Sequence, residues 1–189
     1  MFGIFLDIEA SGLNAKKHRA LEIALKIIDL PSGRFVDSYE SIIKQPRDVW
    51  ERSSKESLQI NGITWEKTLQ GKPEEEVAAE LIALFLRLGI HRKNAAFICQ
   101  NPSFDRAFFS QLIDPDVQEA YGWPYHWLDL ASMHWAIGMQ GNGPLPWETG
   151  LSKDKIAARY GLAPENKPHS ATNGVDHLIA CYQAVVGFM

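Results

Sequence analysis

The stretch that decides the fold is the opening one, Phe2-Gly3-Ile4-Phe5-Leu6-Asp7-Ile8-Glu9. Its apolar run predicts a buried β-strand over residues 1–7 that ends in an acidic residue. Side chains two residues apart on a strand point to the same face, so Asp7 and Glu9 can direct two carboxylates at one point. Such a pair resists joint ionisation unless a cation lies between them, and hard oxygen ligands suit Mg²⁺ or Mn²⁺. The alternative is a solvated strand end.

The rest of the chain predicts a sheet flanked by helices. Residues 20–30 fit both a helix and a strand, but the turn Pro31-Ser32-Gly33 and the strand-like run 35–43 favour a hairpin. Three strands followed by alternating helices and strands indicate an α/β fold with an antiparallel portion of the sheet. The length suits one domain over 1–189. The remaining predicted segments are helices at 54–61, 72–89, 102–113, 153–160 and 175–187, strands at 95–99 and 126–131, and a loop at 138–150.

The composition is that of a soluble globular protein, with 46% hydrophobic and 22% charged residues among 189. No segment reaches the ~20 apolar residues of a membrane span, and the N-terminus lacks the pattern of a signal peptide. We therefore expect a cytoplasmic protein without membrane contact, with Cys99 and Cys181 as reduced core thiols rather than a disulfide. The net charge of −4 weighs against a broad basic face, although an acidic site can reach phosphate through bound cations.

Two more polar groups follow predicted elements. Asp105 comes shortly after the strand 95–99 and would lie in the first turns of the next helix. His169 lies in a loop, and Asp176 lies at the start of the last predicted helix. A histidine near carboxylates and a metal can act as the general base that activates water. The alternatives are structural, because an acid early in a helix complements the helix dipole and a lone histidine is more often structural than catalytic.

These residues lie in segments that resemble the motifs of a known family. The segment 5–13 resembles the first exonuclease motif of the DEDD superfamily, the DnaQ-like 3′→5′ exonucleases, and the segment 101–105 resembles the second. His169-Ser170-Ala171 resembles the third motif of the histidine subtype, which contains proofreading subunits and oligoribonuclease. The segment 60–64 is similar to the connector that these enzymes place beside the 3′ end. The resemblance runs in order over nearly the whole chain.

The resemblance implies a ribonuclease H-like fold with a five-stranded mixed sheet flanked by helices. It implies two divalent ions, Mg²⁺ or Mn²⁺, held by Asp7, Glu9, Asp105 and a fourth carboxylate, with His169 deprotonating the attacking water. The implied activity is hydrolysis at the 3′ ends of single-stranded DNA or RNA, in which two ions stabilise the attacking and leaving oxygens. The choice between DNA and RNA stays open, as does a partnership with a polymerase or a homodimer.

The fourth carboxylate is where this sequence departs from the family. Histidine-subtype members place it five residues after the histidine, and this chain has Gly174 there. Asp176 can take that place if the last helix starts late, which Asn173 as N-cap and Gly174 as a poor helix-interior residue favour. Otherwise Asp176 faces away, because two residues turn a helical side chain by ~200°, and a non-catalytic binding module is the rival interpretation. His177 is a lesser candidate for the base.

Further residues are expected to contact the substrate. The resemblance assigns the backbone amides of residues 10–13 to the terminal nucleotide. Trp65 and Trp147 can stack on bases, which is the usual way to hold a single strand. For Phe104 and both tryptophans, ordinary packing is the alternative. The expected substrate-binding set is Ala10, Ser11, Gly12, Leu13, Ile63, Asn101 and Phe104.

Overall fold

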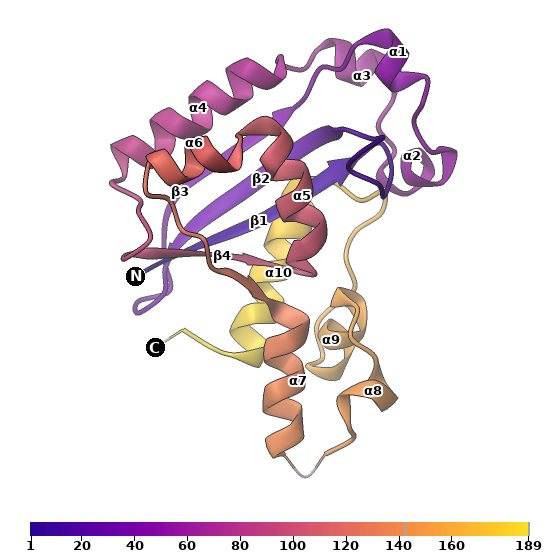
Figure 1. The fold of residues 1–189 in the computed structure, drawn as a ribbon. Coiled ribbons are helices and arrows are strands. Elements are labelled where there is room, and N and C mark those ends of the chain that lie inside the picture. The colour runs from indigo at the N-terminus through magenta and orange to yellow at the C-terminus, as the bar shows by residue number, and fades with distance from the viewer. Residues whose placement is uncertain (142, 189) are drawn as a thin grey trace.

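The computed structural model describes residues 1–141 and 143–188, whose arrangement Figure 1 shows. Within these residues a five-stranded sheet has the order β3-β2-β1-β4-β5. The pairs β1–β2 and β2–β3 are antiparallel, whereas β1–β4 and β4–β5 are parallel. The predicted mixed sheet with an antiparallel portion is therefore confirmed. The strands are β1 (Phe2–Ala10), β2 (Ala20–Asp29), β3 (Arg34–Ile42), β4 (Ala95–Cys99) and β5 (Trp127–Asp129).

Strand β1 lies at the centre of the sheet and extends beyond the predicted residue 7. Ile4, Phe5 and Leu6 are fully buried, because β2 and β4 flank the strand and helices cover both faces. The strand continues to Ala10, so Glu9 has regular strand geometry and lies opposite Glu22 of β2. Asp7 and Glu9 therefore share one face of the sheet, as the alternation of side chains predicts.

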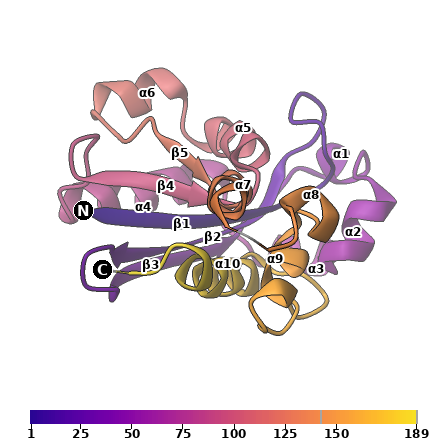
Figure 2. The same ribbon diagram turned by 90° about the horizontal axis from the view of Figure 1, so that it is seen from below.

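Helices form a layer on each face of the sheet, with one hydrophobic core under each layer. Side chains of α4 and α5 pack on the face that carries Ile4, Leu6 and Ile8, and side chains of α10 pack on the face that carries Phe5. Figure 2 shows α10 and α5 on opposite sides of the sheet. The helices are α1 (Arg47–Trp50), α2 (Lys55–Asn61), α3 (Trp65–Leu69), α4 (Glu74–Arg87), α5 (Pro102–Leu112), α6 (Pro115–Ala120), α7 (Leu130–Gln140), α8 (Pro146–Thr149), α9 (Lys153–Arg159) and α10 (Ala171–Val185).

The predicted strand 126–131 is too long. Strand β5 stops at Asp129, because the Asp129 carboxylate accepts hydrogen bonds from the amides of Ala131 and Ser132 and caps a helix. Helix α7 then begins at Leu130 and runs into the predicted loop 138–150, which also contains α8. The loop prediction is therefore correct only in part.

The late start predicted for the last helix is wrong. Ser170 is the N-cap of α10, and its hydroxyl accepts a hydrogen bond from the amide of Asn173. The helix begins at Ala171, so Asn173 and Gly174 both lie inside its first turns. A side chain at position 174 would collide with the Asp7 carboxylate, so this position requires glycine despite its poor helix propensity.

Both cysteines are buried free thiols, as expected. Among the helices described, none is long and apolar enough to cross a membrane.

Candidate active site

A cleft of about 280 Å³ opens beside the carboxyl end of β1. It brings together side chains from β1, the segment after β4, α5, the start of α9 and the loop before α10. Three of the predicted carboxylates and the predicted histidine lie in its wall. The charged and titratable residues that line it include Asp7, Glu9, Asp105, Lys153, Glu165 and His169.

The two carboxylates of β1 lie in surroundings that disfavour their ionised forms. Burial raises the pKa of Asp7, and the charge of Glu165 raises it further, while Lys153 opposes both effects. Burial also raises the pKa of Glu9 to about 8, together with the charges of Asp7 and Glu22. Several acids facing one cleft resist joint ionisation, so this site favours a bound cation.

Asp105 connects α5 to the strand that carries the other two acids. It lies in the first turn of α5 and is 3% exposed. Its Oδ1 accepts a hydrogen bond of 3.0 Å from the amide of Ile8, which lies between Asp7 and Glu9 in the chain. Burial raises the pKa of Asp105 well above its usual range, and the charge of Asp7 adds to this. The hydrogen bond to Ile8 fixes the side chain at the end of β1.

The sequence reasoning missed Glu165 and Lys153. Glu165 lies in the loop between α9 and α10 with its side chain 3% exposed, and Lys153 is the first residue of α9. The Lys153 Nζ lies 2.8 Å from Oε2 of Glu165 and 3.4 Å from Oδ1 of Asp7. Burial alone would lower the pKa of Lys153, but these two carboxylates outweigh burial and raise it. An acid four residues before His169 is visible in the sequence, but only the folded loop shows that it returns to the cleft.

His169 lines the cleft from the loop before α10. Its Nδ1 lies 3.6 Å from Oε1 of Glu165, and its amide donates to the carbonyl of Ile60. The amide of Ala171 donates to the carboxylate of Glu22 on β2 and so ties the same loop to the sheet. The lesser candidate, His177, contacts Glu165 at 3.8 Å and the carbonyl of Ala163, and is not among the lining residues of the cleft.

Asp176 is not brought to this cluster. It lies on the exposed side of α10, with its side chain 54% exposed, and it pairs with Lys26 of β2. The reason is the early start of the helix, which turns position 174 toward the cleft and position 176 away. A Cβ at Gly174 would lie 2.2 Å from Oδ2 of Asp7, so the Asp7 carboxylate fills the space that a side chain there would need.

The last residue of β1 and the loop after it contain four of the expected substrate-binding residues. Ala10 and Ser11 are buried, and the amide of Ser11 already donates to the carbonyl of Arg19. Gly12 packs against the ring of His18, where a Cβ would lie 2.4 Å away. Leu13 is 84% exposed. Only the outer part of this loop is therefore free to meet a ligand.

The other expected contact residues have mixed positions. Phe104 lines the cleft, and its ring also packs on Phe108 at a centroid distance of 4.8 Å. Asn101 adopts a left-handed conformation with φ 58° at the start of α5. Its side-chain amide oxygen Oδ1 accepts a hydrogen bond from the hydroxyl of Ser103. Ile63 is buried, and its amide donates to Oδ1 of Asn61. Of the three, Phe104 alone is placed in the cleft wall.

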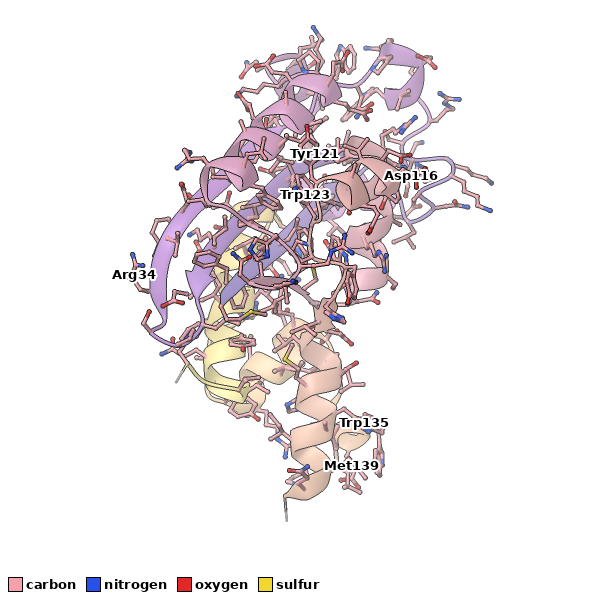
Figure 3. All side chains as sticks on the ribbon, turned by 60° about the vertical axis from the view of Figure 1, so that its left-hand side comes forward. Arg34, Asp116, Tyr121, Trp123, Trp135 and Met139 are labelled. Carbon is pink, nitrogen blue, oxygen red and sulfur yellow. The ribbon has the colours of Figure 1, made fainter. Side chains whose placement is uncertain are left out.

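The two tryptophans have packing partners. The ring of Trp65 lies 5.8 Å from that of Trp50, with the guanidinium of Arg47 at 5.0 Å from its centroid. Trp147 is 53% exposed and lies 5.2 Å from Trp135 of α7. Figure 3 shows Trp135 on the part of α7 that extends away from the sheet. Trp147 therefore packs against the part of α7 that extends away from the sheet.

A second cleft, of about 790 Å³, is basic. The loop between β1 and β2 and the segment of Arg52 line it, and they supply Lys16, Lys17, Arg19 and Arg52. Arg52 is partly neutralised by Asp48. The loop joins the ends of β1 and β2 that carry Glu9 and Glu22, so this cleft lies at the same end of the sheet as the acidic one. A net negative chain thus has a local basic surface.

The carboxylates fit a hard divalent cation in their chemistry. Asp7, Glu9, Asp105 and Glu165 offer oxygen ligands only, which suits Mg²⁺ or Mn²⁺. Within residues 1–141 and 143–188, no three His, Cys, Asp or Glu side chains are already grouped to hold a metal. Lys153 lies between Asp7 and Glu165, so the acids would have to draw together around an ion.

Comparison with known proteins places the chain among nucleases. A family model described as exonuclease (RNase_T) matches residues 4–173, and the match ends one residue before Gly174. A PolC-type DNA polymerase III of Thermotoga petrophila is 33% identical over 106 residues, which are 56% of this chain and 7% of the polymerase. Ribonuclease T of Cronobacter sakazakii is 28% identical over 120 residues, which are 57% of this chain and 50% of that enzyme.

Solved structures show the same fold at low identity. The zinc-bound complex of E. coli ExoI with single-stranded DNA has a TM-score of 0.78 and 18% identity, and covers 97% of this chain and 40% of that one. The cell-death related nuclease 4 (CRN-4) has a TM-score of 0.74 and 14% identity, and covers 96% and 62%. These neighbours have the ribonuclease H-like fold, which confirms the predicted fold class. The chain spans less than two thirds of each of these four proteins.

Proposed function

The chain belongs to the exonuclease family, and on this premise we propose that it is a metal-dependent 3′→5′ exonuclease of the DEDD histidine subtype. Its substrate is the 3′ end of single-stranded DNA or RNA, and residues 1–189 act as one exonuclease domain. The observation that carries the proposal is the convergence of Asp7, Glu9, Asp105 and Glu165 with His169 on one cleft. Acidic oxygen ligands beside a histidine are the groups that metal-assisted phosphodiester hydrolysis requires.

The carboxylates Asp7, Glu9, Asp105 and Glu165 would hold the divalent cation, Mg²⁺ or Mn²⁺. When bound, the cation supplies Lewis acidity, which polarises the phosphate and favours hydroxide over water as nucleophile. Glu165 takes the role that the family gives to the residue five positions after the histidine, where this chain has Gly174. How many ions the cluster holds depends on Lys153, whose ammonium group already lies among the acids.

His169 accepts the proton of the attacking water in this proposal. Its ring lies in the cleft wall, where a water beside the carboxylates can reach it. Glu165, at 3.6 Å from Nδ1, stabilises the imidazolium that forms when the proton arrives. The hydrogen bonds from His169 to Ile60 and from Ala171 to Glu22 hold the loop, so the base keeps its position during turnover.

The basic cleft supports a nucleic-acid substrate. Lys16, Lys17 and Arg19 offer positive charge at the same end of the sheet as the carboxylates. A strand with its terminal phosphate at the acidic cleft could pass its upstream phosphates along these residues. The single-stranded DNA in the ExoI complex supports the same substrate class. Because part of a PolC-type polymerase matches this chain, we propose a polymerase as a candidate partner, and co-purification would test this.

Digestion of a labelled single strand tests this function. An oligonucleotide labelled at its 5′ end should give a ladder that shortens with time in Mg²⁺ or Mn²⁺, because removal begins at the 3′ end. Asp7→Asn and excess chelator should each abolish the ladder, and added cation should restore the chelated sample. Asp116→Asn, on the remote helix α6, is the matched control and should stay active. Full digestion in excess chelator would contradict the proposal.

A binding module that has lost hydrolysis is the second candidate. The observations in its favour are Gly174 at the position of the fourth carboxylate and Lys153 among the remaining acids. Such a protein would retain an oligonucleotide intact in the presence of Mn²⁺. Fluorescence anisotropy beside the digestion assay separates the two, because tight binding with no shortening over hours favours the module.

A further inference from the structure

Lys153 has the contacts of a bound cation rather than those of a surface lysine. An ammonium group has three N–H donors, and three acceptors surround this one. They are Oε2 of Glu165 at 2.8 Å, the carbonyl of Gly174 at 3.1 Å and Oδ1 of Asp7 at 3.4 Å. The side chain is 12% exposed. Each donor therefore has a partner, and two of the three partners are carboxylates of the proposed active site.

The position of the lysine is fixed by the helix that carries it. Lys153 is the first residue of α9, which Ser152 caps through the amide of Lys155. Ile156 and Ala157 anchor the helix in the core, and the carbonyl of Lys153 accepts a weak hydrogen bond from Cys181 of α10. A swing of the ammonium out of the cleft would leave Asp7 and Glu165 without their cation, which is costly for buried charges.

Lys153 and Gly174 together change the charge and the available oxygen ligands of the cleft. Position 174 has a glycine, so the cluster lacks one carboxylate there, and the carbonyl of that glycine binds the ammonium instead. Because Glu165 supplies a fourth carboxylate from another part of the chain, the net change is the positive charge of Lys153, and this charge reduces the need for a second divalent ion. The ammonium group also occupies one oxygen of Glu165 and one of Asp7 that such an ion would use.

We infer that the ammonium group of Lys153 takes the place of one of two divalent cations, so that the site binds a single Mg²⁺ or Mn²⁺ beside a built-in positive charge. This inference rests on the proposed function, since it concerns the same cleft. The ion would be held by Glu9 and Asp105 together with the oxygens of Asp7 and Glu165 that do not contact the ammonium group. The lysine supplies fixed positive charge to a phosphate oxygen in the cleft and, unlike a metal ion, cannot be removed by chelator.

Counting Mn²⁺ without substrate tests the inference. Free Mn²⁺ is followed by electron paramagnetic resonance during titration, and the sites of interest are those that Asp7→Asn removes. The wild-type chain should lose one site on this substitution. Lys153→Met should have two such sites, because Asp7, Glu165 and the Gly174 carbonyl become free to bind an ion. Lys153→Arg keeps the charge and should have one.

The outcomes separate the inference from the function it rests on. Two Asp7-dependent sites in the wild-type chain overturn the inference, and this measurement needs no Lys153 variant to fold. One site in a folded Lys153→Met chain, checked by circular dichroism, overturns it as well. No Asp7-dependent site in the wild type overturns the metal-dependent function itself, and the inference with it.

Discussion

Replacing Gly174 with alanine should disable the active site while leaving the fold nearly as stable. A Cβ at this position would lie 2.2 Å from Oδ2 and 2.6 Å from Cγ of Asp7. Ordinary contact begins near 3.4 Å, so the Asp7 carboxylate must move by about 1 Å. Because Asp7 also binds Lys153, this movement disturbs two of the charged groups in the cleft.

The magnitude follows from that displacement. A misplacement of about 1 Å in a positioning group costs about 100-fold in rate, or about 2.7 kcal/mol in activation free energy. The overpacking costs about 1–3 kcal/mol of stability, and alanine regains about 1 kcal/mol over glycine inside a helix. We therefore expect kcat/KM to fall about 100-fold while the free energy of unfolding falls by no more than about 2 kcal/mol.

The assay compares digestion of a 5′-labelled single strand in Mn²⁺ with urea unfolding of the same samples. Gly141→Ala is the matched control, because its φ of −91° suits alanine and the nearest atom to an added Cβ is 3.8 Å away. It should change neither measurement appreciably. Activity of Gly174→Ala within threefold of wild type would refute the placement of Asp7 against this helix.

Three further predictions concern the acidic and basic clefts. Glu165→Gln should weaken Mn²⁺ binding at least about tenfold by titration, and unchanged affinity would exclude Glu165 from the ion site. Lys17→Ala should lower the slope of log affinity against log salt by about 0.7 for a single strand. Lys93→Ala is the control and should leave the slope unchanged, because Lys93 lies at the amino end of β4, away from the basic cleft. Burial raises the pKa of Glu9 from 4.5 to about 8, so the metal-free folded state holds a proton that the unfolded chain releases. Proton binding by the folded state therefore adds to the free energy of unfolding. This stabilisation is complete below pH 4.5 and is lost as the pH rises through 8. Thermal melts in chelator should show Tm decreasing over this window less steeply in Glu9→Gln than in wild type, and equal slopes would contradict it.

The sequence predicted the sheet well because its strands have strong local patterns. The apolar run of β1, the turn at residues 31–33 and the buried run 95–99 each have one reasonable structure. Local rules failed where two elements meet. Asp129 ends β5 by capping α7, although its residue type also suits a strand end. At α10 two capping residues, Ser170 and Asn173, compete in the sequence, and the choice depends on packing against β1.

Of the carboxylates in the site, the sequence predicted only those that lie on or shortly after a recognisable strand. Asp7 and Glu9 share a strand face, and Asp105 follows the next parallel strand, so all three could be placed from alternation and order. Glu165 and Lys153 come from a loop and a helix start with no pattern of their own. Their place in the cleft arises from the docking of α9 and α10, which no local spacing encodes.

The hydrogen bond from Ile8 to Asp105 gives the protein a built-in spectroscopic probe. An amide proton bound to a buried carboxyl group changes its chemical shift when that group gains a metal or loses a proton. The Ile8 cross-peak in a ¹H–¹⁵N spectrum would then report the occupancy of the cleft directly, in the absence of any nucleic acid. Because the same bond joins α5 to the central strand, its hydrogen-exchange rate would measure how far ion binding stiffens the junction between helix and sheet.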